Sequence, residues 1–158
     1  MDKITGTIKY EYQILRYRHD VVSGEFVNIG IVFFDAEKGF LCARITEKHE
    51  RISHFFGSVS SAFLLAATQQ IERALNDIGG EIAQSPNPSF KSVKEITTSI
   101  LPPNDNSLFF STVFSGWHFD HQKAFDETFE RLIGRYTGET VKAYNEHKTL
   151  VTADLDFV

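Results

Sequence analysis

The fold of this chain is decided by the stretch FVNIGIVFF at residues 26–34. Val, Ile and Phe are the residue types enriched in β-strands, and here they occupy both of the alternating faces. A strand that is apolar on both faces is typical of the centre of a sheet that is covered on two sides. The stretch therefore predicts a central strand. Asn28 and Gly30 interrupt its apolar pattern, because a buried amide needs hydrogen-bond partners and a glycine within a strand often marks a bulge or a close backbone approach.

Two further strands flank this stretch. Residues 40–46 (FLCARIT) predict one of them, and residues 8–18 (IKYEYQILRYR) predict the other. The short segments 19–24 and 35–39 both end in glycine and predict turns, so the three strands form an antiparallel meander. Alternation along residues 8–18 divides the side chains between two faces, with Ile8, Tyr10, Tyr12, Ile14, Arg16 and Arg18 on one and Leu15 and Tyr17 on the other.

The middle of the chain switches to helical spacing. Apolar residues recur with a period near 3.6 over residues 52–78. Gly79 and Gly80 are the expected end of this helix. The candidates for its N-cap are Ser58, Ser60 and Ser61.

A second helix is predicted from Asp120 to just before Gly138, and residues 107–114 predict a further strand of the same sheet. Residues 91–101 fit more than one structure. The inward face of the second helix is expected to carry Phe125, Phe129, Leu132, Ile133 and Tyr136.

These elements predict an α+β fold, in which two main helices pack on at least one face of a small, mainly antiparallel sheet. The sheet consists of the N-terminal three-stranded meander plus a later strand. A length of 158 residues fits a single domain over residues 1–158. Within it, residues 139–158 are expected to be a peripheral C-terminal tail, with a short helix over 140–147 and then an edge strand or an unpaired segment.

Composition narrows the class of protein. The chain has 16 Lys and Arg against 21 Asp and Glu, a net charge of −5, which argues against non-specific nucleic-acid binding because that affinity comes from basic residues at phosphates. The lone cysteine, Cys42, forms no intramolecular disulfide.

Apolar runs such as residues 29–34 are far below the ~20 residues that a membrane span needs, and residues 1–9 lack the apolar core of a signal peptide. We therefore expect a cytoplasmic protein that does not bind membranes.

The dense group of polar residues lies on the first two predicted strands. Arg16 and Arg18 share a largely apolar face, and Glu25 and Asn28 lie at the start of the next strand, within reach if the two strands pair. In one interpretation these groups form an internal Arg–Glu pair, with the Asn bonded to the backbone, that fixes the register of the strands. In the other they line a pocket, where arginine would bind a phosphate, a carboxylate or a peptide terminus through paired hydrogen bonds.

No motif for catalysis or for a cofactor stands out. The sequence has no Walker loop, dinucleotide-binding glycine pattern, HExxH, CxxC pair or GxSxG, so no catalytic residue, cofactor or metal is assigned. Cys42 lies in a predicted strand and is expected to be a small buried hydrophobe. In WHFDH at residues 117–121, Asp120 is expected to cap a helix between two exposed histidines. A zinc site would need three or four ligands, and no remote partner is visible.

The motif YxILRY at residues 12–17, an aspartate at position 20 and the stretch from Gly24 to Phe34 closely resemble the opening signature of the bacterial DUF3037 family. The strand around residues 107–113 and the helix over 125–135 are similar to that family's C-terminal half. His19 stands where the family usually has a proline. The function of the family is unknown, and the resemblance implies no catalytic residues. Members are often encoded beside proteins with a HipA-like kinase fold, which implies an accessory or antitoxin-like role.

Two functions stay open. In the first, the chain is a non-catalytic accessory module that docks a protein partner through a sheet edge or through the region of Arg16, Arg18, Glu25 and Asn28. In the second, it is a small hydrolase or transferase acting on a phosphorylated ligand. Arg16 and Arg18 would then hold the phosphate, with Glu25 as general base and Asn28 orienting it. The lack of a recognisable nucleophile–base pair favours the first function.

Overall fold

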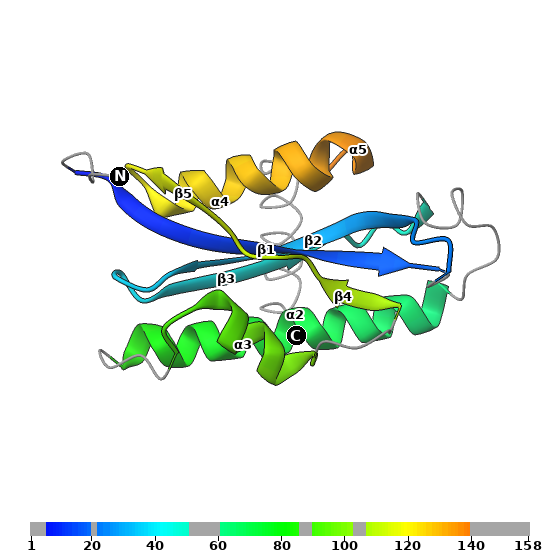
Figure 1. The fold of residues 1–158 in the computed structure, drawn as a ribbon, viewed down its shortest axis with the longest axis horizontal. Helices are drawn as coiled ribbons and strands as arrows, with labels where there is room; N and C mark the ends of the chain where they lie inside the picture. Colours follow the sequence, from blue (N-terminus) through cyan, green and yellow to red (C-terminus); the bar gives the residue numbers. More distant parts are fainter. Residues whose placement is uncertain (1–5, 20–21, 51–60, 86–89, 103–106, 140–158) are drawn as a thin grey trace, which may run out of the picture.

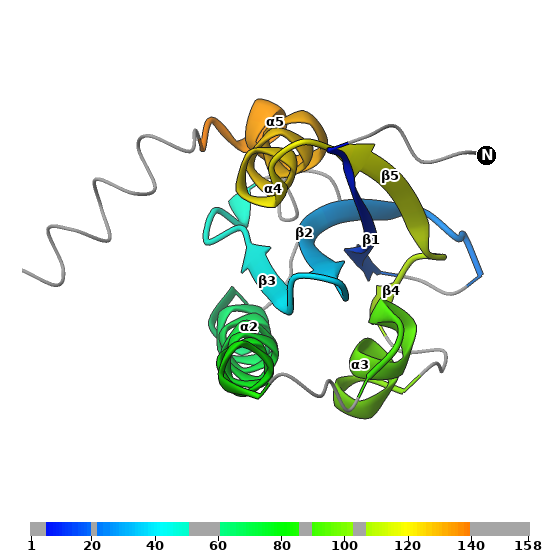
Figure 2. The same cartoon turned by 90° about the vertical axis from the view of Figure 1, so that its left-hand side faces the viewer.

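The computed structural model describes residues 6–19, 22–50, 61–85, 90–102 and 107–139. In this part of the chain a five-stranded sheet lies between two layers of helices (Figure 1, Figure 2), which confirms the α+β fold. The strands are β1 (Ile8–Arg18), β2 (Phe26–Asp35), β3 (Phe40–Ile45), β4 (Leu108–Phe110) and β5 (Phe114–His118). The helices are α2 (Ser61–Gln84), α3 (Val93–Ile100), α4 (His121–Phe129), the π-helix η1 (Glu130–Gly134) and α5 (Arg135–Thr137).

β1 organises the sheet. The strand order is β3-β2-β1-β4, β5 also pairs with β1, and all the pairs are antiparallel. The predicted meander of β1, β2 and β3 is therefore confirmed. β4 and β5 pair with successive parts of the same edge of β1, β4 near its C-terminal end and β5 near its N-terminal end.

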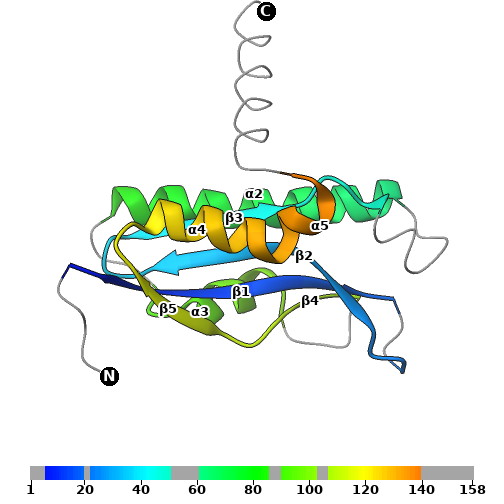
Figure 3. The same ribbon diagram turned by 90° about the horizontal axis from the view of Figure 1, so that it is seen from above.

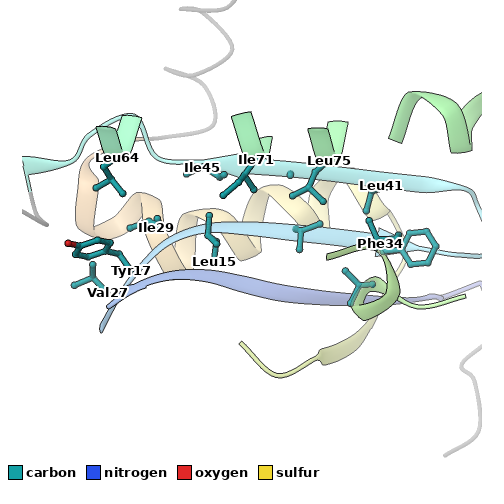
Figure 4. Packing of buried hydrophobic residues seen from close by; sticks show 14 of the residues in the cluster. Leu15, Tyr17, Val27, Ile29, Phe34, Leu41, Ile45, Leu64, Ile71 and Leu75 are labelled. Carbon is teal, nitrogen blue, oxygen red and sulfur yellow. The ribbon is translucent and has the colours of Figure 1, made fainter. Parts of the chain in front are cut away.

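Each face of the sheet buries its own apolar cluster. α2 and α3 cover one face, where Leu64, Ile71 and Leu75 of α2 pack onto the meander (Figure 4). α4 and η1 cover the other face, where Phe125 and Phe129 pack against Ile31 and Phe33 of β2 (Figure 3). β2 is thus a central strand with both faces buried, as its composition predicts.

The prediction that α2 ends at Gly79 and Gly80 is wrong, because this helix continues to Gln84. A Cβ atom at Gly79 would lie 2.4 Å from the carbonyl oxygen of Leu41 in β3. Gly79 therefore lets the helix approach the strand closely, and Ile82 in the next turn is buried. Tertiary packing offsets the low helix propensity of the two glycines.

The outer edge of the sheet also differs from the prediction. Residues 107–114 form no continuous strand, because β4 ends at Phe110 and the unpredicted strand β5 begins only at Phe114. The segment 91–101, which the pattern left open, contains α3. Its N-cap Ser92 accepts a hydrogen bond from the backbone N–H of Glu95.

The last predicted helix is confirmed from its N-cap Asp120 to Gly138, which has the left-handed φ of 79° typical of a helix end. Its middle turn, η1, is a π-helix that the spacing does not reveal. The extra residue in a π-turn rotates the positions that follow it. Tyr136, predicted to point inward, is therefore 57% exposed, whereas Phe129 and Ile133 are fully buried as predicted.

Residues 52–59 of the first predicted helix, two of its N-cap candidates (Ser58 and Ser60) and the whole segment 140–158 lie outside the described residues. Among the helices that the structure describes, none combines the length and the apolar character required to cross a membrane.

Candidate functional site

The candidate site lies at the C-terminal end of β1, on the sheet face that α4 covers elsewhere. The register places Arg16 of β1 opposite Asn28 of β2 on one side and Phe109 of β4 on the other. Arg18, two residues along the same face, is opposite Phe26 of β2. Figure 3 shows this end of β1 extending past α5, and the ring of Phe26 is 44% exposed.

A β-bulge brings Arg16 and Asn28 to the same face. Leu15 pairs with Gly30, but the next residue of β1, Arg16, pairs with Asn28, so Ile29 is the extra residue. In a regular register Arg16 would face Ile29, and Asn28 would point to the other face. Gly30 permits the close approach of β3 here, because a Cβ atom would lie 2.7 Å from Cγ1 of Ile45. Asn28 and Gly30, which interrupt the apolar stretch of β2, therefore both belong to the β-bulge.

Arg16 is held by an amide and an aromatic ring. Its Nε donates a hydrogen bond of 3.1 Å to Oδ1 of Asn28, and its Cζ lies 4.3 Å from the centroid of the Phe26 ring. The guanidinium is half-buried, and this burial lowers the pKa of Arg16 from its usual value. No carboxylate of the described residues forms an ion pair with it.

Arg18, two residues further along β1, also lies over an aromatic ring. Its Cζ lies 4.3 Å from the centroid of the Phe109 ring, and the rings of Phe26 and Phe109 meet edge to face with centroids 6.0 Å apart. Guanidinium groups and aromatic rings thus alternate across three strands. We call this patch the Arg–Phe surface; it comprises Arg16, Arg18, Phe26, Asn28 and Phe109.

Of the four predicted binding residues, Glu25 is the one that does not join this group. It directly precedes β2 and is exposed. In the described part of the chain, no hydrogen bond or ion pair joins Glu25 to Arg16 or to Asn28. The amide of Asn28, bonded to Arg16, takes the place that the sequence interpretation gave to the carboxylate.

Sequence reasoning missed both aromatic rings of the surface. Phe26 belongs to the stretch that predicts β2, and Phe109 to the strand predicted over 107–114, and neither is among the candidate site residues of the sequence analysis. Alternation alone could have placed Phe26 and Asn28 on one face. The pairing of β4 with β1, which brings Phe109 to Arg16, joins segments more than 90 residues apart and leaves no local signal.

The polar residues around the start of α4 have structural partners. Asp120 accepts hydrogen bonds from the backbone N–H groups of Gln122 and Lys123, which lower the pKa of its carboxyl. Nδ1 of His121 lies 3.3 Å from the buried carboxylate of Asp35, and its ring stacks on Phe40. Across the described residues, no three His, Cys, Asp or Glu side chains are arranged to hold a metal ion.

The sequence of the chain matches a known protein family. A family model described as "Protein of unknown function (DUF3037)" matches residues 12–133. No curated protein and no solved structure matches the chain. The matched range runs from β1 into η1 and contains every residue of the Arg–Phe surface.

Proposed function

This chain belongs to the DUF3037 family, and we propose that it is a non-catalytic module that binds an acidic segment of a partner protein at the Arg–Phe surface. One observation carries the proposal: the half-buried guanidinium of Arg16 is fixed by Asn28 and Phe26 and has no ion pair with a carboxylate of the described residues. A partly desolvated charge without a counter-ion is unfavourable. A carboxylate of a partner would supply that counter-ion.

The chemistry of the surface suits a carboxylate. The Nε–H of Arg16 is used by Asn28, and no other described residue forms a hydrogen bond or ion pair with the guanidinium. Its terminal N–H groups suit a ligand in the bidentate geometry that guanidinium and carboxylate share. Phe26 and Phe109 add exposed or half-buried aromatic area beside the charge. Arg and aromatic residues are the types enriched at the energetic centres of protein interfaces.

The net charge of the chain favours a protein over a nucleic acid as the partner. A polyanion that spans many phosphates would approach a molecule with a net charge of −5, and its affinity would need many basic contacts. A short acidic segment needs only the local positive charge of Arg16 and Arg18. The association that the family resemblance implies makes a HipA-like kinase-fold protein the first partner to test.

The edge of the sheet at β3 is closed to a partner strand. The side-chain oxygen of Asn76 in α2 accepts from the backbone N–H of Ala43 at 3.0 Å, and its amide group donates to the carbonyl of Ala43 at 3.1 Å. These bonds occupy both backbone groups of Ala43 in the middle of β3, where an added strand would have to pair. We therefore place docking on the face of the sheet rather than on this edge.

The hydrolase or transferase alternative stays a prediction, and the geometry gives it less support. Its general base, Glu25, is exposed and is not bonded to Arg16 or Asn28. A general base must reach its proton within about 2.6–3.2 Å, and nothing in the described residues orients Glu25 beside the guanidinium of Arg16.

The test is partner capture from the native host with tagged wild-type protein and an Arg16→Gln variant. Arg135→Gln, on the exposed α5, is the matched control because it removes the same charge away from the surface. We expect a stoichiometric partner that wild type and control retain and Arg16→Gln loses, and that rising salt releases. Equal retention by Arg16→Gln, with its fold confirmed by thermal unfolding, would contradict the proposal.

A further inference from the structure

Specific hydrogen bonds hold the segment between β4 and β5 against β1. Ser111 keeps one backbone bond to β1, from its N–H to the carbonyl of Ile14 at 2.8 Å. The return bond is made by its side chain, since the backbone N–H of Ile14 donates to Oγ of Ser111 at 2.9 Å. The side-chain amide of Gln13 donates to the carbonyl of Ser111 at 2.7 Å. Side chains thus replace the ladder bonds that a continuous strand would make.

Helix α3 completes this network from the other side. The hydroxyl of Thr97 donates to Oε1 of Gln13 at 2.5 Å, and Gln13, Thr97 and Ser111 are all buried. Buried polar networks that are satisfied hold one arrangement, because each unsatisfied member would be costly. The interruption of the edge strand is therefore a fixed feature of the fold rather than a frayed end.

A groove of about 530 Å³ opens between α3 and this broken edge; Figure 2 shows α3 lying beside β4. The volume lies in the range of small-molecule sites, roughly 300–1,000 Å³. Its lining combines two cations, polar groups and an apolar wall, and it contains no acidic residue among the described ones: Gln13, Arg18, Lys94, Thr98, Leu101, Pro102, Phe109, Phe110, Ser111, Thr112 and Val113.

Two carboxylates at the start of α3 accept hydrogen bonds from backbone N–H groups there, and neither lines the groove. Glu11 accepts from the backbone N–H of Val93, and Glu95 accepts from that of Lys91. Lys94 and Thr98 are one helical turn apart, so they point to the same side of α3, and both line the groove. An ammonium group and a hydroxyl are therefore presented together beside an apolar wall.

We propose that this groove binds a small phosphate monoester with an apolar body. The phosphate lies at Lys94 and Thr98, whose donors match its oxygens. The apolar body packs against the wall formed by Leu101, Phe109 and Phe110, and Arg18 supplies a second positive charge at the end of β1. The groove adjoins the Arg–Phe surface and shares Arg18 and Phe109 with it. The two sites can still be tested separately, because Lys94 lines only the groove and Arg16 belongs only to the Arg–Phe surface.

The test is a titration of the whole chain with phenyl phosphate, followed by amide chemical shifts in NMR spectra. We expect saturable shifts at residues 111–113 and along α3. Lys94→Met keeps the aliphatic stem and removes the charge, and it should weaken binding at least about tenfold, the typical effect of losing a charge-assisted hydrogen bond. Lys91→Met, a lysine outside the groove, should change nothing.

Two further ligands test the chemistry of the site. Benzoate carries a carboxylate on the same ring, and inorganic phosphate lacks the ring, so both should bind more weakly than phenyl phosphate. Equal binding of either ligand, non-saturable shifts with phenyl phosphate, or wild-type affinity in Lys94→Met would overturn the proposal. Arg16→Gln should bind phenyl phosphate normally, so the partner proposal and this one can fail separately.

Discussion

The protein contains the same pair of groups, an arginine over a phenylalanine ring, in two different settings on one sheet face. Arg44 of β3 lies 4.0 Å from the centroid of Phe129, and its side chain is only 3% exposed under α4 and η1. Arg16 of β1 lies 4.3 Å from the centroid of Phe26, at the end of the sheet, where the ring is 44% exposed.

Whether helices α4 and η1 cover the arginine–phenylalanine pair decides how much the pair stabilises the fold. A desolvated cation–π contact is worth about 2 kcal/mol, whereas an exposed one contributes about 0.5–1 kcal/mol. The pair of Arg44 and Phe129 is therefore part of the core on which α4 packs. The pair of Arg16 and Phe26 adds little to the fold and presents a fixed positive charge to solvent, which is the property that a binding surface needs.

The largest expected difference between the two settings comes from removing the rings. Phe129→Ala should lower the free energy of unfolding by about 3–5 kcal/mol, because the ring is fully buried between the sheet and η1. Phe26→Ala should lower it by less than about 1 kcal/mol, and its effect should appear as weaker partner binding. Urea denaturation measures both variants under the same conditions.

Similar losses of unfolding free energy in Phe129→Ala and Phe26→Ala would contradict the difference between the two settings. A loss of several kcal/mol in Phe26→Ala would mean that the exposed ring supports the fold, and the Arg–Phe surface would then be a structural feature. The slope of the denaturation curve should stay the same in both variants, because neither changes the surface that unfolding exposes by much.

Gly30→Ala tests the bulge that lies between the two settings. An added Cβ would lie 2.7 Å from Cγ1 of Ile45 and 2.9 Å from the carbonyl oxygen of Arg44, so β2 and β3 must move apart. We expect a loss of about 1–3 kcal/mol in unfolding free energy. The shift should also weaken partner binding, since the bulge holds Asn28 beside Arg16. A neutral effect on unfolding would contradict the close approach at this position.

The parts of the fold that follow from local patterns could be predicted from the sequence. The meander follows from short turns between apolar strands, and the two-sided burial of β2 follows from apolar residues on both of its faces. The faces of β1 follow from alternation between neighbouring residues. The end of α2 could not be predicted, because Gly79 is explained by its contact with Leu41 in another element. The break between β4 and β5 depends in the same way on Gln13 and Thr97, which lie far away in the sequence.

The candidate site was predictable in its residue types but not in its partners. An arginine on an apolar face and an asparagine in an apolar strand both signal a buried polar contact, and the structure joins them as Arg16 and Asn28. Arg44 gave the same signal from β3 and was not selected. The sequence could not tell which of these arginines a helix covers.

A smaller, pH-dependent effect should come from a buried histidine that follows β3, the strand that carries Arg44. His49, which follows β3, is buried, and its Nε2 lies 3.1 Å from the carbonyl oxygen of Thr46. Burial lowers the pKa of His49 below its usual 6.5, and the backbone bond and the charges of Glu139 and Glu47 partly oppose this shift. The unfolded chain therefore takes up a proton first as pH falls, so stability should decrease below about pH 6.5.

His49→Gln should remove this part of the pH dependence. The measurement is thermal unfolding between about pH 5 and 8, with the wild-type chain as reference. The difference in stability between wild type and variant should grow more unfavourable to wild type as pH falls. A difference that is constant over this range would show that His49 has the same proton affinity in the folded and unfolded states.

The smallest expected effect is the coupling between Arg16 and Asn28, and it separates a binding role from a structural one. In a double-mutant cycle with Arg16→Gln and Asn28→Ala, the interaction free energy should be about 0.5–1.5 kcal/mol, the range of a single partly exposed hydrogen bond. A buried ion pair that maintained the register would couple by about 3 kcal/mol or more when it is broken. Because Asn28 carries no charge, its hydrogen bond orients the guanidinium of Arg16 without neutralising it. Weak coupling in the isolated chain together with a large loss of partner binding in Arg16→Gln is the combination that only a binding surface gives.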